Sequence, residues 1–138
     1  LLVTKAGITI RGRSAQETIL SFRDQKAGPQ GILATHDRFR IENLTVEDTA
    51  GNGIKVIGAN NVQFVNVRVR WTKKLSPENG AYGVYPVLSK NILIENCEVS
   101  DASDAGIYVG QSSQILVRGN DVHHNVAGIE IENSDDAD

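Results

Sequence analysis

Hydrophobic and polar residues follow a pattern that recurs along the chain, and each recurrence starts at a glycine followed by a β-branched residue. These pairs are Gly31-Ile32, Gly53-Ile54, Gly83-Val84, Gly106-Ile107 and Gly128-Ile129. Successive glycines are 22, 30, 23 and 22 residues apart, so one unit repeats and a single copy carries an insertion. Such a period is typical of supersecondary units that stack and bury a core only together.

Within each unit, short stretches alternate between apolar and polar residues with period two. One unit contains the stretches 54–56, 62–64 and 67–69, separated by a polar turn and a bend. β-Branched residues dominate these stretches, and the spacing leaves no room for a helix of about ten residues. The connections are also too short for a βαβ crossover. The pattern therefore predicts an all-β coil with three short strands in each turn, or rung.

Equivalent positions of successive rungs are expected to stack in columns with a spacing of about 4.8 Å. Four columns are uniformly large and apolar, which predicts a filled core. They are Ile32/Ile54/Val84/Ile107/Ile129, Phe39/Val62/Ile92/Ile115, Ile41/Phe64/Ile94/Val117 and Val46/Val69/Val99/Val122.

The bend inside each unit has its own column, in which Asn43, Asn66 and Asn96 align with Gly119. Residues of these types tolerate a left-handed backbone. Next to the bend, the alternation places Cys97 inward as a small apolar filler, with a reactive thiol as the alternative.

Composition narrows the possible functions. The chain has 138 residues, of which 40% are hydrophobic and 22% charged, and a formal net charge of −3. These values indicate one globular domain over residues 1–138 and argue against nucleic-acid binding. No apolar run approaches the roughly 18 residues of a membrane span, and no cofactor motif occurs, so we expect neither a span nor a cofactor.

The two ends of the sequence suggest how the domain continues. The chain starts abruptly at Leu1 and stops within a unit, so we interpret it as an N-terminal piece of a longer coil. Open end rungs expose unpaired strand edges, and these favour end-to-end self-association.

Several runs resemble a known family. Residues 7–12, 18–22, 41–49 and 104–110 look like right-handed parallel β-helix proteins of the pectin-lyase-like superfamily. Residues 79–87 and 127–134 are similar to bacterial β-helix proteins of unassigned activity. The resemblance implies a right-handed, single-stranded parallel β-helix of about six rungs. It also implies an extracellular or periplasmic location.

In carbohydrate-active members of that superfamily, the substrate usually lies along the strand that here follows each glycine. Outward positions of this strand include Lys55, Tyr85, Tyr108 and Glu130. Aromatic rings beside a cation and a carboxylate could hold sugar rings by stacking and charged hydrogen bonds. We take these four residues as candidate saccharide-binding residues; a purely stabilising cross-strand aromatic pair is the alternative.

The insertion lies at residues 72–82 and leads directly into this column. It adds Tyr82 to the candidate binding residues, and it would also bring Lys73 and Lys74 to the rim. Cations at the rim could face the carboxylates of a uronate polymer. A surface insertion without function is the alternative reading.

The turn Thr35-His36-Asp37-Arg38 is the best local candidate for chemistry. With the preceding Gly31-Ile32 it looks partly like the Asp-Pro-His-Asp motif of uronate C5-epimerases in the superfamily, without the leading Asp-Pro pair. Proton abstraction next to a carboxylate needs a base, a neutraliser of the carboxylate and an acid. The base could be His36 or a tyrosine, the neutraliser Arg38 or Lys55, and the acid Tyr85. Solvated turn residues are the alternative.

The neighbouring residues His123 and His124 offer a possible metal site. Consecutive residues of a strand point to opposite faces, so these imidazoles are not expected to share an ion. We therefore expect no metal site.

Two hypotheses about function remain. In the first, the domain binds or modifies an extracellular polysaccharide of the uronate type, and an enzyme of this kind would resemble a polysaccharide lyase or a C5-epimerase. In the second, it is a non-catalytic repeat scaffold with a structural or adhesive role.

Overall fold

The computed structural model describes residues 1–138 and consists of fifteen strands without a helix. The strands are β1 (Leu2–Val3), β2 (Thr9–Arg11), β3 (Ile19–Ser21), β4 (Ile32–Ala34), β5 (Phe39–Glu47), β6 (Ile54–Ile57), β7 (Asn60–Arg70), β8 (Val84–Val87), β9 (Lys90–Glu95), β10 (Glu98–Ser100), β11 (Ala105–Gly110), β12 (Ser113–Arg118), β13 (Asp121–His123), β14 (Ala127–Glu132) and β15 (Asp135–Ala137). No helix is present that is long and apolar enough to span a membrane.

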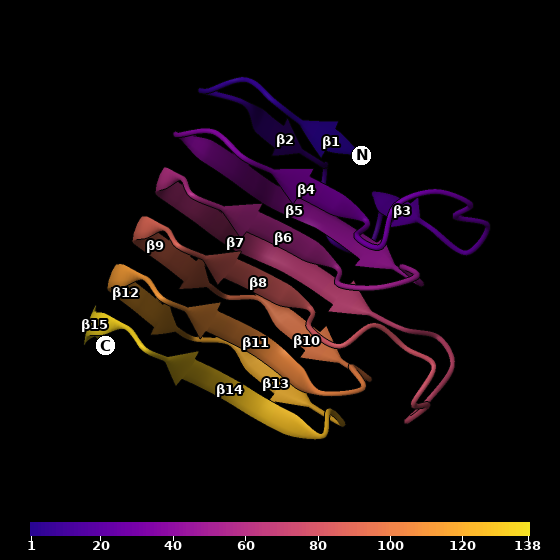
Figure 1. Ribbon diagram of the computed structural model, residues 1–138. Helices are drawn as coiled ribbons and strands as arrows, with labels where there is room; N and C mark the ends of the chain where they lie inside the picture. Colours follow the sequence, from indigo (N-terminus) through magenta and orange to yellow (C-terminus); the bar gives the residue numbers. More distant parts are fainter.

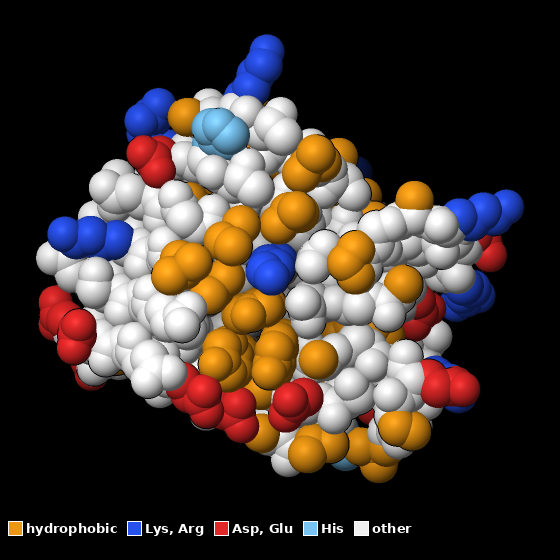
Figure 2. Space-filling model, viewed as in Figure 1, with side chains coloured by type: hydrophobic (Ala, Val, Ile, Leu, Met, Phe, Trp, Pro, Cys, Tyr) orange, Lys and Arg blue, Asp and Glu red, His pale blue; other side chains and the backbone are white.

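The strands form two sheets in which the registered pairs are parallel. A six-stranded sheet runs β1-β4-β6-β8-β11-β14 and a nine-stranded sheet contains the other strands. Figure 1 shows the rungs stacked in chain order, and the six-stranded sheet faces the viewer both there and in Figure 2. The prediction of a parallel β-helix is confirmed, with one strand of the six-stranded sheet in each rung.

The predicted columns are also confirmed. Ile32 pairs with Ile54 and Ile54 with Val84, and the same register continues through Ile107 to Ile129. In two rungs the second and third predicted strands run together as the continuous strands β5 and β7. The bend at Asn43 and Asn66 is still present inside these continuous strands, because in-register parallel stacking gives each rung the same backbone path as the next rung.

The asparagines at the bend have the expected left-handed backbone. The φ values of Asn43, Asn66 and Asn96 are 57°, 52° and 52°, and Gly119 has a φ of 64°. The Asn66 side-chain amide donates a hydrogen bond of 3.1 Å to the Asn43 side chain. Asparagine is suited to this position because its short side chain bonds locally while the backbone turns.

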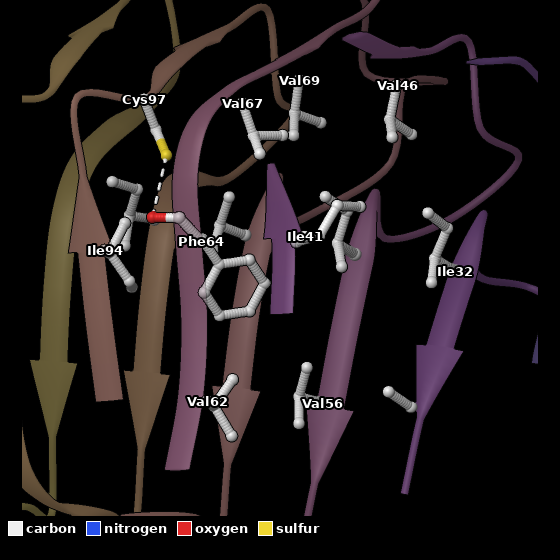
Figure 3. Close-up of a cluster of buried hydrophobic side chains, with 14 of the residues drawn as sticks. Ile32, Ile41, Val46, Val56, Val62, Phe64, Val67, Val69, Ile94 and Cys97 are labelled. Carbon is white, nitrogen blue, oxygen red and sulfur yellow. Dashed lines mark hydrogen bonds between the residues drawn. The ribbon is translucent and has the colours of Figure 1, made fainter. Parts of the chain in front are cut away.

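The core lies between the two sheets and is made by the apolar columns. Figure 3 shows side chains such as Ile41, Val62 and Phe64 pointing into it from neighbouring rungs. Burying one such side chain stabilises the fold by about 1.5–3 kcal/mol. At the last rung the column meets solvent, and Ile129 is 47% exposed.

Cys97 is the inward filler that the alternation predicts. Its side chain is buried, and its Sγ donates to the Phe64 carbonyl oxygen at 3.6 Å, the dashed line in Figure 3. Burial raises the pKa of the thiol to about 11, which keeps it protonated and unreactive near neutral pH. In the next rung Asn120 takes this position, and its side-chain amide bonds to the Cys97 N–H and the Ile94 carbonyl.

Candidate functional site

Four of the candidate residues form one row across the six-stranded sheet. Lys55 on β6 pairs with Tyr85 on β8, and Tyr108 on β11 pairs with Glu130 on β14. β8 and β11 are themselves adjacent through Val84 and Ile107. Figure 2 shows this face as a band of hydrophobic and tyrosine side chains with a cation within it and acidic groups along its lower border.

Three tyrosines pack together in the middle of this face, and we call Tyr82, Tyr85 and Tyr108 the tyrosine cluster. The rings of Tyr82 and Tyr108 are stacked, with centroids 4.6 Å apart and planes at 26°. Tyr85 meets both rings edge to face, at 4.9 Å from Tyr82 and 5.3 Å from Tyr108. Each such contact adds about 0.5–1.5 kcal/mol beyond burial, and all three side chains remain half-exposed.

The polar groups around the cluster are of two kinds. Lys55 places its Nζ 4.8 Å from the centroid of the Tyr85 ring and forms no ion pair. On the other side, the Tyr108 hydroxyl donates a hydrogen bond of 2.9 Å to Glu132. Glu130 is half-buried and forms neither an ion pair nor a side-chain hydrogen bond, so its carboxylate is available to a ligand.

Neighbouring carboxylates and burial raise the pKa values of two of the tyrosines. The hydrogen bond to Glu132, with burial adding to it, raises the pKa of Tyr108 to about 12. Burial, followed by the negative charge of Asp104, raises the pKa of Tyr82. Both tyrosines therefore stay neutral near neutral pH and keep their hydroxyl groups as hydrogen-bond donors.

Glu132 and Gly110 complete the site, although the sequence did not single them out. Tyr108 lies along its own strand above Gly110, where a Cβ atom would be only 2.8 Å from the Tyr108 Cε1. Glu132 pairs with Gly110 on the adjacent strand, so the tyrosine hydroxyl reaches it across the glycine. The repeat predicts which positions share a column, but how far a tyrosine ring reaches along the strand depends on its rotamer.

The insertion at 72–82 brings Tyr82 into the cluster, as predicted. Hydrogen bonds and one close backbone contact hold the insertion in the position that allows this. The Trp71 indole N–H donates to the Thr49 carbonyl at 2.9 Å, and the Asn79 amide donates to the Asp101 carbonyl at 2.7 Å. Gly80 packs so closely on Gly51 that no side chain would fit between them.

The two lysines of the insertion are both engaged in ion pairs, so they are not the free cations that the sequence predicts at the rim. Lys73 pairs with Glu78 within the insertion, and Lys74 pairs with the buried Asp101 at 3.0 Å. Burial would raise the pKa of Asp101, but Lys74 and hydrogen bonds from Ser100 and Leu75 hold it below its usual value. Both ion pairs therefore help to anchor the loop.

His36 and Arg38 lie in the exposed turn between β4 and β5, apart from the tyrosine cluster. β6 separates β4 from the Tyr85 strand. The His36 Nδ1 lies 2.9 Å from the Thr35 hydroxyl, and Asp37 accepts the Asn60 N–H at 2.8 Å. The catalytic roles assigned to His36 and Arg38 remain predictions.

The imidazoles of His123 and His124 lie on the same side, contrary to the alternation argument. Their Nδ1 atoms are 2.6 Å apart, and Glu98 lies 3.5 Å from the His123 Nε2. The reason is local: β13 ends at His123, and His124 has a left-handed φ of 56°. No group of three or more His, Cys, Asp or Glu side chains is placed to hold a metal ion.

Comparison with known proteins gives one match. The family model described as the right-handed β-helix region covers residues 6–137. Neither the curated proteins nor the solved structures include one that matches the chain.

Proposed function

Since this chain belongs to the right-handed β-helix family over nearly its whole length, we propose that it is a β-helix domain that binds a polysaccharide across the tyrosine cluster. The observation that carries the proposal is the cluster itself: three half-exposed tyrosines on an open sheet face, with a lysine on one side and a free carboxylate on the other. Rings of this kind stack on the apolar faces of sugars.

The dimensions of the row favour a polymer. Lys55 and Glu130 are three strand spacings apart, which amounts to roughly 14 Å at about 4.8 Å for each spacing. A single sugar ring cannot contact both ends, whereas a chain of sugars laid across the strands can. Because β6, β8 and β11 are held by parallel ladders on both sides and β14 by one, most of the face is preorganised and little entropy is lost on binding.

Binding without chemistry is the form of the proposal that the geometry favours. Proton abstraction next to a carboxylate needs a base, an acid and a neutraliser of the carboxylate within reach of one sugar. His36 and Arg38 lie across β6 from the Tyr85 strand. The raised pKa values of Tyr82 and Tyr108 keep both phenols protonated at neutral pH, so neither is in the form that accepts a proton. A polysaccharide ligand supports an extracellular or periplasmic location, which we include in the proposal.

A structural scaffold is the second candidate, and one observation favours it. The tyrosines contact one another, and the Tyr108 hydroxyl already donates a hydrogen bond to Glu132. The cluster therefore stabilises the sheet even without a ligand. The two candidates differ in what happens when the tyrosines are removed.

The test is binding of the chain to a panel of neutral, anionic and cationic polysaccharides, compared with the double variant Tyr85→Ala, Tyr108→Ala. We expect the double variant to lose at least about tenfold in affinity, because two ring contacts are removed. The matched control is Leu93→Ala with Leu116→Ala, a half-buried outward pair on the other sheet. Absence of binding by the wild type, or equal binding by both double variants, would leave the scaffold as the better account.

A further inference from the structure

We call the outward side of the six-stranded sheet, which carries the tyrosine cluster, the tyrosine face. Its charge limits which polysaccharides it can bind. The six strands of this sheet contain one cationic side chain, Lys55, and two carboxylates, Glu130 and Glu132. A third carboxylate, Asp104, lies immediately before β11 and acts on Tyr82. The face therefore carries an excess of negative charge, on the side where Glu130 is unpaired.

The cations that would balance this charge are engaged elsewhere. Lys73 pairs with Glu78, and Lys74 pairs with Asp101, whose side chain is 1% exposed. Breaking the second pair would leave a buried carboxylate without a partner, which is costly. A polymer with a carboxylate on every sugar would thus meet one lysine and several carboxylates.

The tyrosine rings themselves bind a cation in this structure. The Lys55 ammonium lies over the face of Tyr85, at 4.8 Å from the ring centroid. Ring faces attract ammonium groups through their quadrupole, and carboxylates beside the rings strengthen the attraction. The combination of Tyr82, Tyr85 and Tyr108 with Glu130 and Glu132 is suited to further ammonium groups presented at the spacing of the rungs.

We infer that the polysaccharide recognised by this face carries amino groups, as in a polymer of deacetylated hexosamine, and is not a polyuronate. The inference depends on the proposed function, because it names the class of sugar that the same face binds. Sugar rings would stack on the tyrosines while their ammonium groups contact Glu130 and Glu132. Lys55, at the other end of the row, would repel the ammonium groups.

The experiment measures binding of the 138-residue chain to three probes by calorimetry: a glucosamine oligomer, its N-acetylated counterpart and a galacturonate oligomer. We expect the glucosamine oligomer to bind at least about tenfold more tightly than the other two, as charge-assisted hydrogen bonds imply. This preference should vanish as the pH rises through the pKa of the sugar ammonium groups, and added salt should reduce it.

Two variants with opposite expected effects sharpen the test. Glu130→Gln should weaken binding of the glucosamine oligomer by about tenfold and leave binding of the N-acetylated oligomer unchanged. Lys55→Gln should strengthen binding of the glucosamine oligomer, since it removes a repelling charge. Glu17→Gln, an exposed residue at the other end of the solenoid, is the matched control and should change neither.

The outcomes separate the inference from the proposed function. If the N-acetylated or the galacturonate oligomer binds as well as the glucosamine oligomer, the face binds saccharides but the inferred class is wrong. Weaker glucosamine binding by Lys55→Gln would also overturn it. If no oligomer binds, the proposed function falls and the inference with it.

Discussion

At the scale of single residues, Tyr108 is the side chain that connects the parts of the site. It stacks on Tyr82, meets the edge of Tyr85, lies above Gly110 and donates to Glu132. A carboxylate that accepts a hydrogen bond from a phenol favours the neutral phenol, which is why the pKa of Tyr108 rises to about 12.

Replacing Glu132 by Gln should lower the pKa of Tyr108 toward the ordinary value of about 10. The ultraviolet absorbance of phenolate, followed during an alkaline titration, measures this change. In the wild type the pKa of Tyr108 is higher in the folded than in the unfolded state, so the stabilisation is complete below the unfolded pKa and is lost as the pH rises toward 12. The variant should lose the Tyr108 contribution to this alkaline dependence of stability and keep that of Tyr82, whereas Glu95→Gln, which removes a partner of Arg118 on the other sheet, should keep both. An unshifted titration in Glu132→Gln would contradict the assignment.

At the scale of elements, the insertion at 72–82 shows how a loop can be held as firmly as a strand. Its end packs on the preceding rung, where a Cβ at Gly80 would lie 1.7 Å from the Gly51 carbonyl oxygen and 2.7 Å from Trp71. This close approach sets where Tyr82 enters the tyrosine cluster.

Gly80→Ala should therefore destabilise the domain by about 1–3 kcal/mol, as overpacking does. The same substitution at Gly128, where a Cβ would meet nothing within 4 Å, is the control and should change stability by no more than about 0.5 kcal/mol. Urea unfolding of the two variants measures the difference. Equal stabilities would mean that the insertion is not fixed by this contact.

At the scale of the whole molecule, the two ends of the solenoid have opposite charge. Residues 1–26 contain five Lys or Arg and two Asp or Glu, whereas residues 121–138 contain six Asp or Glu and no Lys or Arg. Both ends also expose apolar side chains, including Leu2 at 61% and Ile129 at 47%. For the isolated 138-residue chain we therefore expect head-to-tail association, with the acidic end of one copy on the basic end of the next.

Sedimentation of the chain at increasing concentration should show open-ended assembly at low salt that weakens at high salt, because the ends attract each other through screened charges. Reversing the acidic end with Asp135→Lys and Asp138→Lys should shift the chain toward monomer. Glu78→Lys, an exposed reversal in the insertion, should leave the assembly unchanged. A chain that is monomeric at every salt concentration would contradict this expectation.

Most of the fold could be predicted because each rung repeats the one before it. In parallel in-register stacking a residue lies next to its own equivalent, so aligning the units of the sequence also aligns the strands. This is why the core columns, the Asn66 bend and the inward Cys97 were all predicted correctly. The same logic put Tyr85 and Tyr108 side by side.

The predictions that failed lie where the repeat does not apply. His124 leaves the strand alternation with a left-handed backbone, and Lys73 and Lys74 belong to the insertion, which has no equivalent in other rungs. Their orientation depends on which partner is nearest in space. Glu132 was missed for a related reason, since the register placed it beside Gly110 but did not show that the Tyr108 ring extends over the glycine.

The sequence by itself thus determined the coil, its register and the outward row, because a short-range repeat is enough to specify parallel stacking. The tertiary structure alone decided the contacts among the three tyrosines and Glu132, the docking of the insertion and the pairing of its lysines. These contacts are not specified by the repeat, and the partners of the side chains are selected by distance, burial and rotamer once the rungs have stacked.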